Sequence, residues 1–266
     1  MTDIKSKTLK LDLFAYLKAL FDLMKPRVMS LVIFTCVVGL LIAPVKVDFW
    51  NAFVSILAVA LGSGAAGVLN MWYEADLDSA MTRTCLRPIP TGKVTKKEAL
   101  IFGILASVIS VTILYLFSNL VATLILVTTI LFYVFIYTVW LKQKTSQNIV
   151  IGGVSGALPP VIGWAVATGN ISFESIILFL IIFIWTPSHF WALSLYKMED
   201  YKNANIPMLP VISGVKVTKL NIFVYALLLF PIILAPFFLN YFGTIYLLIS
   251  GTLATYYIYI CYKLFR

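Results

Sequence analysis

Residues 70–87 have the sequence Asn-Met-Trp-Tyr-Glu-Ala-Asp-Leu-Asp-Ser-Ala-Met-Thr-Arg-Thr-Cys-Leu-Arg and follow a long apolar segment. Asn70, Glu74 and Asp78 are four residues apart, so on a helix they share one narrow face. Oxygen-bearing side chains in such a column repel one another unless a cation lies among them. Mg²⁺ takes one or two carboxylates and completes its shell with substrate phosphates. The spacing therefore predicts a divalent-metal site that binds a diphosphate.

The remaining charges of this stretch fit the same interpretation. Arg83 and Arg87 present the planar donors that grip phosphate oxygens. Asp76 lies off the shared face, since each helical residue adds roughly 100° of rotation. It can serve a second metal, Arg83 or water. Simple solvation of a helix end would explain one isolated carboxylate, but it explains a column followed by two arginines less well.

The composition indicates a membrane protein. The chain has 266 residues, of which 61% are hydrophobic and only 12% are charged, whereas a soluble protein carries roughly a quarter charged residues. Apolar stretches long enough to cross a hydrocarbon core of about 30 Å predict an all-α polytopic bundle of eight transmembrane helices. They cover residues 28–45, 51–70, 98–117, 119–140, 149–168, 173–194, 220–239 and 242–262.

The basic residues predict the orientation of this bundle. Of the 20 Lys and Arg, 19 lie on one side of the predicted spans, and only Lys46 lies on the other. The positive-inside rule makes the basic side cytoplasmic, so we expect both termini there. The net charge of +9 then reflects topology and is weak support for nucleic-acid binding. No targeting segment is evident, which favours a prokaryotic inner (plasma) membrane over a mitochondrial inner membrane.

The layout predicts one membrane domain over 1–266, with a cytoplasmic arm at 1–27. Two long cytoplasmic loops, 71–97 and 195–219, each open with an acidic cluster. Because their parent spans lie four helices apart, we expect two four-helix halves with both clusters meeting at a cytoplasmic active site. No carboxylate lies in the middle of a predicted span, which argues against a proton or ion pathway.

Further polar residues are candidates for substrate contacts. Lys142 and Lys144 follow the fourth predicted span, where ordinary positive-inside residues are expected, and Lys142 is also placed to supplement the arginines. The cluster of Lys197, Glu199 and Asp200 is either a charged helix end or the opposite wall of the diphosphate site. The other polar candidates in these regions are Tyr137 and Asn148.

His189 is the only histidine of the chain and falls inside the sixth predicted span. An imidazole facing lipid is costly, so we expect it to face the bundle interior or a cavity. It either bonds a neighbouring helix or contacts the substrate, as a haem-iron ligand or a polar group. On a helix it shares a face with Asp200 and lies about 16 Å below it.

With these pieces placed, the sequence resembles the UbiA superfamily of intramembrane prenyltransferases, and within it the family that farnesylates haem b. The superfamily motif Asn-x3-Asp-x3-Asp is present as Asn70, Glu74 and Asp78, with Glu at its middle position. The resemblance covers roughly residues 20–215. The matching motifs are Lys25-Pro-Arg27-Val, Asp78-x2-Met81-x-Arg83-Thr84-x2-Arg87, Asn148-x3-Gly152, Gly156-Ala-x-Pro-Pro160-x2-Gly163-Trp164, Trp185-Thr-Pro-x-His189-Phe-Trp-Ala-Leu193 and Glu199-Asp-Tyr-x-x-Ala204-x-Ile-Pro-Met-Leu-Pro210.

Two features depart from the wider superfamily. Its second acidic motif has two carboxylates four residues apart, whereas Asp200 is followed at that distance by Ala204, as is general in the haem-farnesylating family. Members of the family usually have nine spans, and eight are found.

The resemblance implies transfer of the farnesyl group of farnesyl diphosphate to a vinyl group of haem b, giving haem O for terminal oxidases. Haem A synthase or a terminal oxidase would be the protein partner. We expect Mg²⁺, or another divalent cation, to be held by Glu74, Asp78 and Asp200. The diphosphate would be oriented by Asn70, Arg83, Arg87 and Lys142.

Two other functions stay open from the sequence alone. One is prenyl transfer to a quinone precursor or another aromatic acceptor, which needs no particular histidine. The other is a haem or lipid transporter without chemistry, against which the one-sided acidic site argues.

Overall fold

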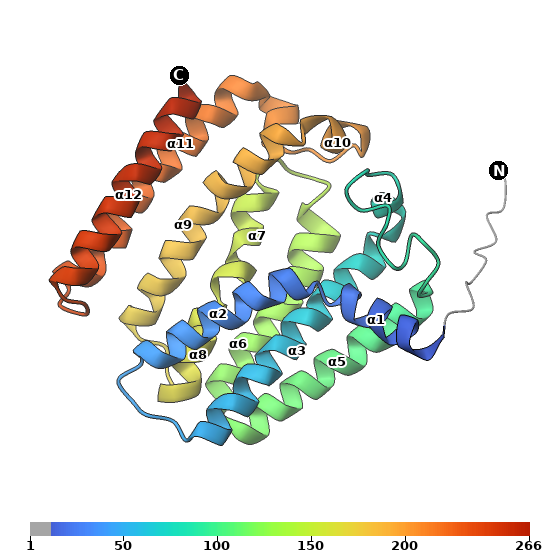
Figure 1. Ribbon diagram of the computed structural model, residues 1–266, viewed down its shortest axis with the longest axis horizontal. Coiled ribbons are helices and arrows are strands. Elements are labelled where there is room, and N and C mark those ends of the chain that lie inside the picture. The colour runs from blue at the N-terminus through green and yellow to red at the C-terminus, as the bar shows by residue number, and fades with distance from the viewer. Residues whose placement is uncertain (1–11) are drawn as a thin grey trace.

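The computed structural model describes residues 12–266, and every regular element in this range is a helix (Figure 1). The first half of the chain forms α1 (Leu13–Leu23), α2 (Pro26–Ile42), α3 (Phe49–Tyr73), α4 (Ala75–Ser79), α5 (Lys96–Phe117), α6 (Leu120–Leu131) and the π-helix η1 (Phe132–Leu141). The second half forms α7 (Asn148–Ala157), α8 (Pro159–Thr168), α9 (Phe173–Tyr196), α10 (Met198–Asn203), α11 (Leu209–Phe238) and α12 (Thr244–Phe265).

The helices confirm a polytopic membrane bundle. Seven helical segments of residues 12–266 are long and apolar enough to cross a membrane, and the pair α1–α2, bent by 53°, makes an eighth if it counts as one span. Two of the seven are composite, because α6 continues into η1 and α7 into α8. Large apolar side chains are exposed along α5, α11 and α12, where lipid tails can cover them.

Two predicted segments outside the spans contain helices that were not predicted. In the described part of the N-terminal arm, α1 forms and buries Ala19 and Leu23. Asp12 caps this helix by accepting the N–H of Ala15 at 2.7 Å. The predicted loop 195–219 is also mostly helical. α10 lies inside it, and α11 starts at Leu209 and tolerates one non-helical residue, Gly214, at φ 79°.

Small residues allow α2 and α8 to pack backbone against backbone. A Cβ built on Gly163 would lie 1.9 Å from the Cys36 carbonyl oxygen. A Cβ built on Gly39 would lie 2.0 Å from the Pro160 carbonyl oxygen. Such approach needs glycine on both sides. Because α2 belongs to the first half of the chain and α8 to the second, this contact joins the two predicted halves.

The loops that follow α3 and α9 lie at one end of the bundle, which we call the motif end. Figure 1 shows α4 and α10 there, near each other, although they are far apart in sequence. A hydrogen bond from Thr82 to Asp200 joins the two loops. A buried apolar cluster that includes Met81, Tyr201 and Ile206 packs them together. The motif end therefore brings both acidic clusters of the sequence into one region.

Candidate functional site

The predicted column of polar side chains forms where α3 ends. α3 stops at Tyr73, yet the helical hydrogen-bond pattern continues, from Glu74 N–H to the Asn70 carbonyl at 3.0 Å and from Asp78 N–H to the Glu74 carbonyl at 2.7 Å. Asn70, Glu74 and Asp78 are each only 2% exposed. Such buried carboxylates need compensating partners, since an unpaired buried charge is very costly.

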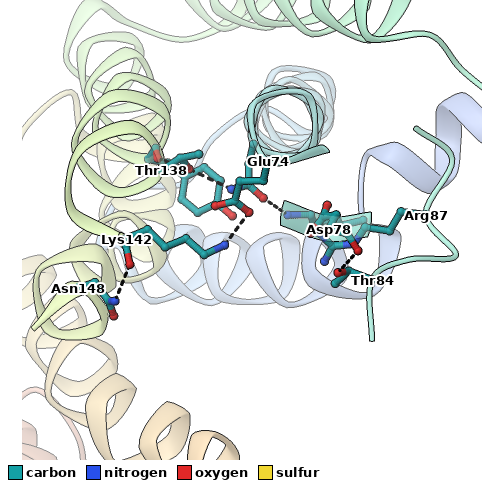
Figure 2. Close-up of polar contacts among 10 residues, drawn as sticks. Glu74, Asp78, Thr84, Arg87, Thr138, Lys142 and Asn148 are labelled. Atoms are coloured by element: carbon teal, nitrogen blue, oxygen red, sulfur yellow. Dashed lines mark hydrogen bonds and ion pairs between the residues drawn. The ribbon is translucent and has the colours of Figure 1, made fainter. Parts of the chain in front are cut away.

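Lys142 compensates Glu74. Its ammonium lies 2.5 Å from Oε2 of Glu74, reaching across from the end of η1 (Figure 2). The side chains are 19% and 1% exposed, so water screens this pair little. The second carboxylate oxygen of Glu74, Oε1, is buried and has no hydrogen-bond partner within residues 12–266. Glu74 therefore has one oxygen available for a further positive group.

Arg87 compensates Asp78 in the same way. One guanidinium nitrogen of Arg87 lies 2.6 Å from Oδ2 of Asp78 (Figure 2). The loop is fixed beside them, because the hydroxyl of Thr84 donates to the Asp78 carbonyl oxygen at 2.9 Å. The Arg87 side chain remains 22% exposed, so it is still partly accessible while it pairs with the buried carboxylate.

Asn70 is held by two partners on different helices. Its Oδ1 accepts from the ammonium of Lys25 at 2.5 Å, and its Nδ2 donates to the hydroxyl of Thr138 at 3.0 Å. Lys25 sits between α1 and α2 in a left-handed conformation, with φ 55°. The bend between these helices thus delivers Lys25 to the motif end of α3.

The π-helix η1 sets the register of the residues that face α3. In a π-helix each N–H bonds the carbonyl five residues earlier, and such segments are frequent at functional sites. The hydroxyl of Thr138 donates to the Tyr133 carbonyl oxygen at 2.9 Å. The rings of Tyr133 and Tyr137 stack with centroids 5.5 Å apart. Beyond η1, the amide of Asn148 donates to the Lys142 carbonyl oxygen at 3.0 Å and so anchors that lysine.

The second acidic cluster does not join the first as a metal site. Asp200 accepts from the hydroxyl of Thr82 at 2.7 and 2.9 Å, while Glu199 and Arg83 are exposed. Within residues 12–266 no group of three His, Cys, Asp or Glu is placed to hold a metal ion. The structure therefore does not bring the three predicted metal ligands together, because Asp200 is bound to the neighbouring loop.

Two other candidates also lie outside the buried cluster. Asp76 forms an exposed ion pair with Lys96 at 2.7 Å, and its side chain is 89% exposed. The ammonium of Lys197 lies over the ring of Tyr196, 5.0 Å from its centroid. These residues occupy the same end of the bundle without touching the column of Asn70, Glu74 and Asp78.

The sequence predicted that His189 faces the bundle interior or a cavity, but it does not reach the core of the bundle. Its side chain is exposed on α9, where the imidazole stacks on Trp185 with ring centroids 4.3 Å apart. An edge contact with Phe190 at 5.3 Å completes this aromatic surface. Stacking one turn along the helix gives the imidazole a partner without burial, so it needs no second helix.

A mostly apolar cavity adjoins the polar cluster. Its volume is about 110 Å³, and it lies among α2, α3, α6, η1 and the junction of α7 with α8. Lys25 and Tyr133 line it, and both connect to Asn70, directly or through Thr138. An amphiphile with an anionic head and an apolar tail therefore matches the cluster and the cavity together.

Sequence reasoning missed two residues of the cluster. Lys25 was counted as a topological charge and as part of a family motif, but it was not predicted to contact the site. Thr138 carried no signal at all, because a threonine in an apolar span resembles ordinary packing.

The fold and the site define a family. Residues 32–266 match the model of the UbiA prenyltransferase family. The chain therefore belongs to this family and is an integral, multi-pass membrane protein.

Within that family the chain belongs to the protoheme IX farnesyltransferases. It is 60% identical over 247 residues to the protoheme IX farnesyltransferase of Pelagibacter ubique, covering 93% of this chain and 82% of the relative. It is 50% identical over 246 residues to that of Parvibaculum lavamentivorans, covering 92% and 77%.

Solved structures support the fold. A digeranylgeranylglyceryl phosphate synthase superposes with a TM-score of 0.79 at 21% identity, covering 94% of this chain and 87% of that one. A UbiA homolog from Archaeoglobus fulgidus bound to DMAPP and Mg²⁺ superposes with a TM-score of 0.73 at 15% identity, covering 92% and 86%.

Proposed function

We propose that this chain transfers the farnesyl group of farnesyl diphosphate to a vinyl group of haem b, giving haem O. The observation that carries the proposal is the buried cluster of Glu74, Asp78, Lys142 and Arg87 beside an apolar cavity. Membership among the protoheme IX farnesyltransferases supports haem b as the acceptor.

The cations of the cluster act on the diphosphate. Lys142, Arg87 and Lys25 converge on the column, and Arg83 is exposed on the same loop as Arg87. When the C1–O bond of farnesyl diphosphate breaks, negative charge builds on the leaving oxygen. Fixed cations stabilise that charge without reorganising. Lys142 and Arg87 each exchange a carboxylate for a phosphate oxygen as the substrate enters.

The residues of the column fit a divalent cation such as Mg²⁺. Oε1 of Glu74 is a buried carboxylate oxygen without a partner within residues 12–266, and Asp78 is the next carboxylate along. Mg²⁺ usually takes only one or two protein carboxylates together with substrate phosphates. Glu74 and Asp78 would hold it, and the ion would neutralise the leaving diphosphate. The Mg²⁺ complex of the Archaeoglobus fulgidus homolog supports this assignment.

The acceptor step needs no bond to the protein. Diphosphate leaves with the electron pair of the C1–O bond, so the farnesyl group becomes an allylic cation. The vinyl group of haem b then donates its π electrons, and the new C–C bond forms between its terminal carbon and farnesyl C1. Water adds at the other vinyl carbon as hydroxyl and releases one proton. The apolar wall of the cavity keeps water from the farnesyl cation before that. The exposed imidazole of His189 and the ring of Trp185 offer a surface for the flat porphyrin.

We further propose that the motif end faces the cytoplasm of a prokaryote, since the spans predicted from the sequence place 19 of the 20 Lys and Arg on that side. Haem O would then pass to haem A synthase or to a terminal oxidase in the same membrane.

The test uses membranes that contain the full chain. We expect the mass of haem O when haem b, farnesyl diphosphate and Mg²⁺ are supplied together, and no product from an Asp78→Ala variant. Product with a quinone precursor in place of haem b would favour the other prenyltransferase function. Haem release without any product would favour a transporter, and full activity of Asp78→Ala would refute the assigned site.

A further inference from the structure

The hydroxyl of Thr138 has a fixed hydrogen-bond direction. A hydroxyl has one proton to donate, and here that proton goes to the Tyr133 carbonyl oxygen at 2.9 Å. A carbonyl cannot donate, so the direction of this bond cannot reverse. Towards Asn70, 3.0 Å away, Thr138 can therefore only accept.

This direction determines which end of the Asn70 amide faces Lys25. Because Thr138 only accepts, Asn70 must turn its NH₂ group to Thr138 and its carbonyl oxygen Oδ1 to the other side. The Lys25 ammonium, which has no acceptor capacity, lies 2.5 Å from that oxygen. A flipped amide would place two donors against each other at Lys25 and two acceptors against each other at Thr138. Thr138 is 1% exposed and Asn70 is 2% exposed, so water cannot substitute.

We propose that Thr138 is a positioning residue for prenyl diphosphate binding: it orients the Asn70 amide and thereby holds the Lys25 ammonium at the head-group site. The chain of contacts runs from the Tyr133 carbonyl through Thr138 and Asn70 to Lys25. This role of Thr138 rests on the proposed function only because it requires a prenyl diphosphate as ligand. It does not depend on which molecule accepts the prenyl group.

The π-helical register makes this relay possible. In an α-helix a threonine hydroxyl bonds the carbonyl three or four residues earlier, but Thr138 bonds the carbonyl five residues earlier, which is the π-helical spacing. The wider turn faces the hydroxyl towards α3. The relay is therefore built from the local backbone and one side chain, and it joins η1 to α3 and to the α1–α2 bend.

The experiment measures binding of an unreactive thiolo analogue of farnesyl diphosphate, with Mg²⁺, to purified full-length protein by calorimetry. Thr138→Val keeps the shape but removes the hydroxyl. We expect roughly tenfold weaker binding, as for loss of one hydrogen bond in a charged network, and near-normal binding by Thr138→Ser. In the farnesylation assay, KM for farnesyl diphosphate should rise with little change in kcat.

A double-mutant cycle distinguishes positioning from general damage. If Thr138 acts through Lys25, Thr138→Val combined with Lys25→Met should bind no more weakly than Lys25→Met alone. Thr123→Val is the matched control, because Thr123 is a buried threonine of the neighbouring α6 whose hydroxyl bonds only the Asn119 carbonyl. It should bind the analogue normally.

Three outcomes would overturn the proposal: normal analogue binding by Thr138→Val, equal loss in Thr138→Ser, or fully additive effects in the cycle. If the valine variant does not fold, Thr138→Cys provides the same comparison, since a thiol is only a weak hydrogen-bond partner. Analogue binding does not depend on haem, so a chain that fails to make haem O would contradict the proposed function while leaving this test intact.

Discussion

Replacing Lys142 with Met should destabilise the protein strongly, because it leaves a buried carboxylate without its cation. The Glu74 side chain is 1% exposed and the Lys142 side chain 19%. Removing one partner of a buried ion pair costs about 3–5 kcal/mol. The partial exposure of Lys142 favours the low end, about 3 kcal/mol, which corresponds to a fall in Tm of roughly 6–12 °C.

Thermal unfolding of the purified protein in detergent measures this change. The matched control is Lys96→Met, which removes the cation of an ion pair whose side chains are 47% and 89% exposed. Exposed pairs contribute about 0–1 kcal/mol, so this variant should unfold close to wild type. The double variant Lys142→Met/Glu74→Gln removes both buried charges and should regain most of the lost Tm, although it should not regain activity.

The double variant also provides the refutation. If it is no more stable than Lys142→Met, the loss comes from packing of the lysine stem and not from an uncompensated Glu74. An unchanged Tm in Lys142→Met would show that Glu74 is neutral or hydrated, and the buried ion pair would be wrong.

Three further outcomes are expected. Gly163→Ala should lower Tm sharply, because its Cβ would lie 1.9 Å from the Cys36 carbonyl oxygen. Gly251→Ala should not, because its Cβ would lie 3.7 Å from a side-chain carbon of Leu234, which is ordinary contact; scanning fluorimetry compares the two variants. Asp78→Asn should reduce kcat/KM at least a hundredfold, because an amide binds Arg87 more weakly and offers the metal no negative charge. Asp76→Asn, at an exposed position, should keep kcat/KM within about threefold of wild type. Steady-state kinetics measures both values. Chelation of divalent cations should abolish turnover and leave Tm within a few degrees, since the carboxylates are already paired with cations; adding Mg²⁺ back should restore the rate.

The sequence predicted the fold well where apolar length is the only signal needed. Lipid imposes a nearly fixed span length, so α3, α5, α9 and α12 lie close to their expected limits. The prediction of helix limits from the sequence failed where helices continue outside the apolar core. The start of α11 carries polar residues and a glycine at φ 79°, so its first turns resembled a loop.

The candidate site was predictable only where its residues are close together in the sequence. Asn70, Glu74 and Asp78 are local in sequence, and their four-residue spacing alone puts them on one face. Their partners are remote: Lys25 is 45 residues from Asn70, and Lys142 is 68 from Glu74. These pairings depend on a helix bend and on a π-helix, neither of which leaves a periodic pattern.

The metal site was the least predictable part. The prediction grouped Asp200 with the column because both clusters lie at one end of the bundle. Proximity of loops does not decide which hydroxyl or cation satisfies a carboxylate, and Thr82 bonds Asp200 instead.

The mass of the product formed in water enriched in heavy oxygen tests the central claim most directly. Membranes containing the chain receive haem b, farnesyl diphosphate and Mg²⁺, and the haem fraction is analysed by mass spectrometry. We predict haem O that is heavier by one substituted oxygen, because its hydroxyl comes from water, and no product from Asp78→Ala. Unmodified haem b from the wild-type chain, or labelled haem O from the Asp78→Ala variant, would contradict farnesyl transfer at this site.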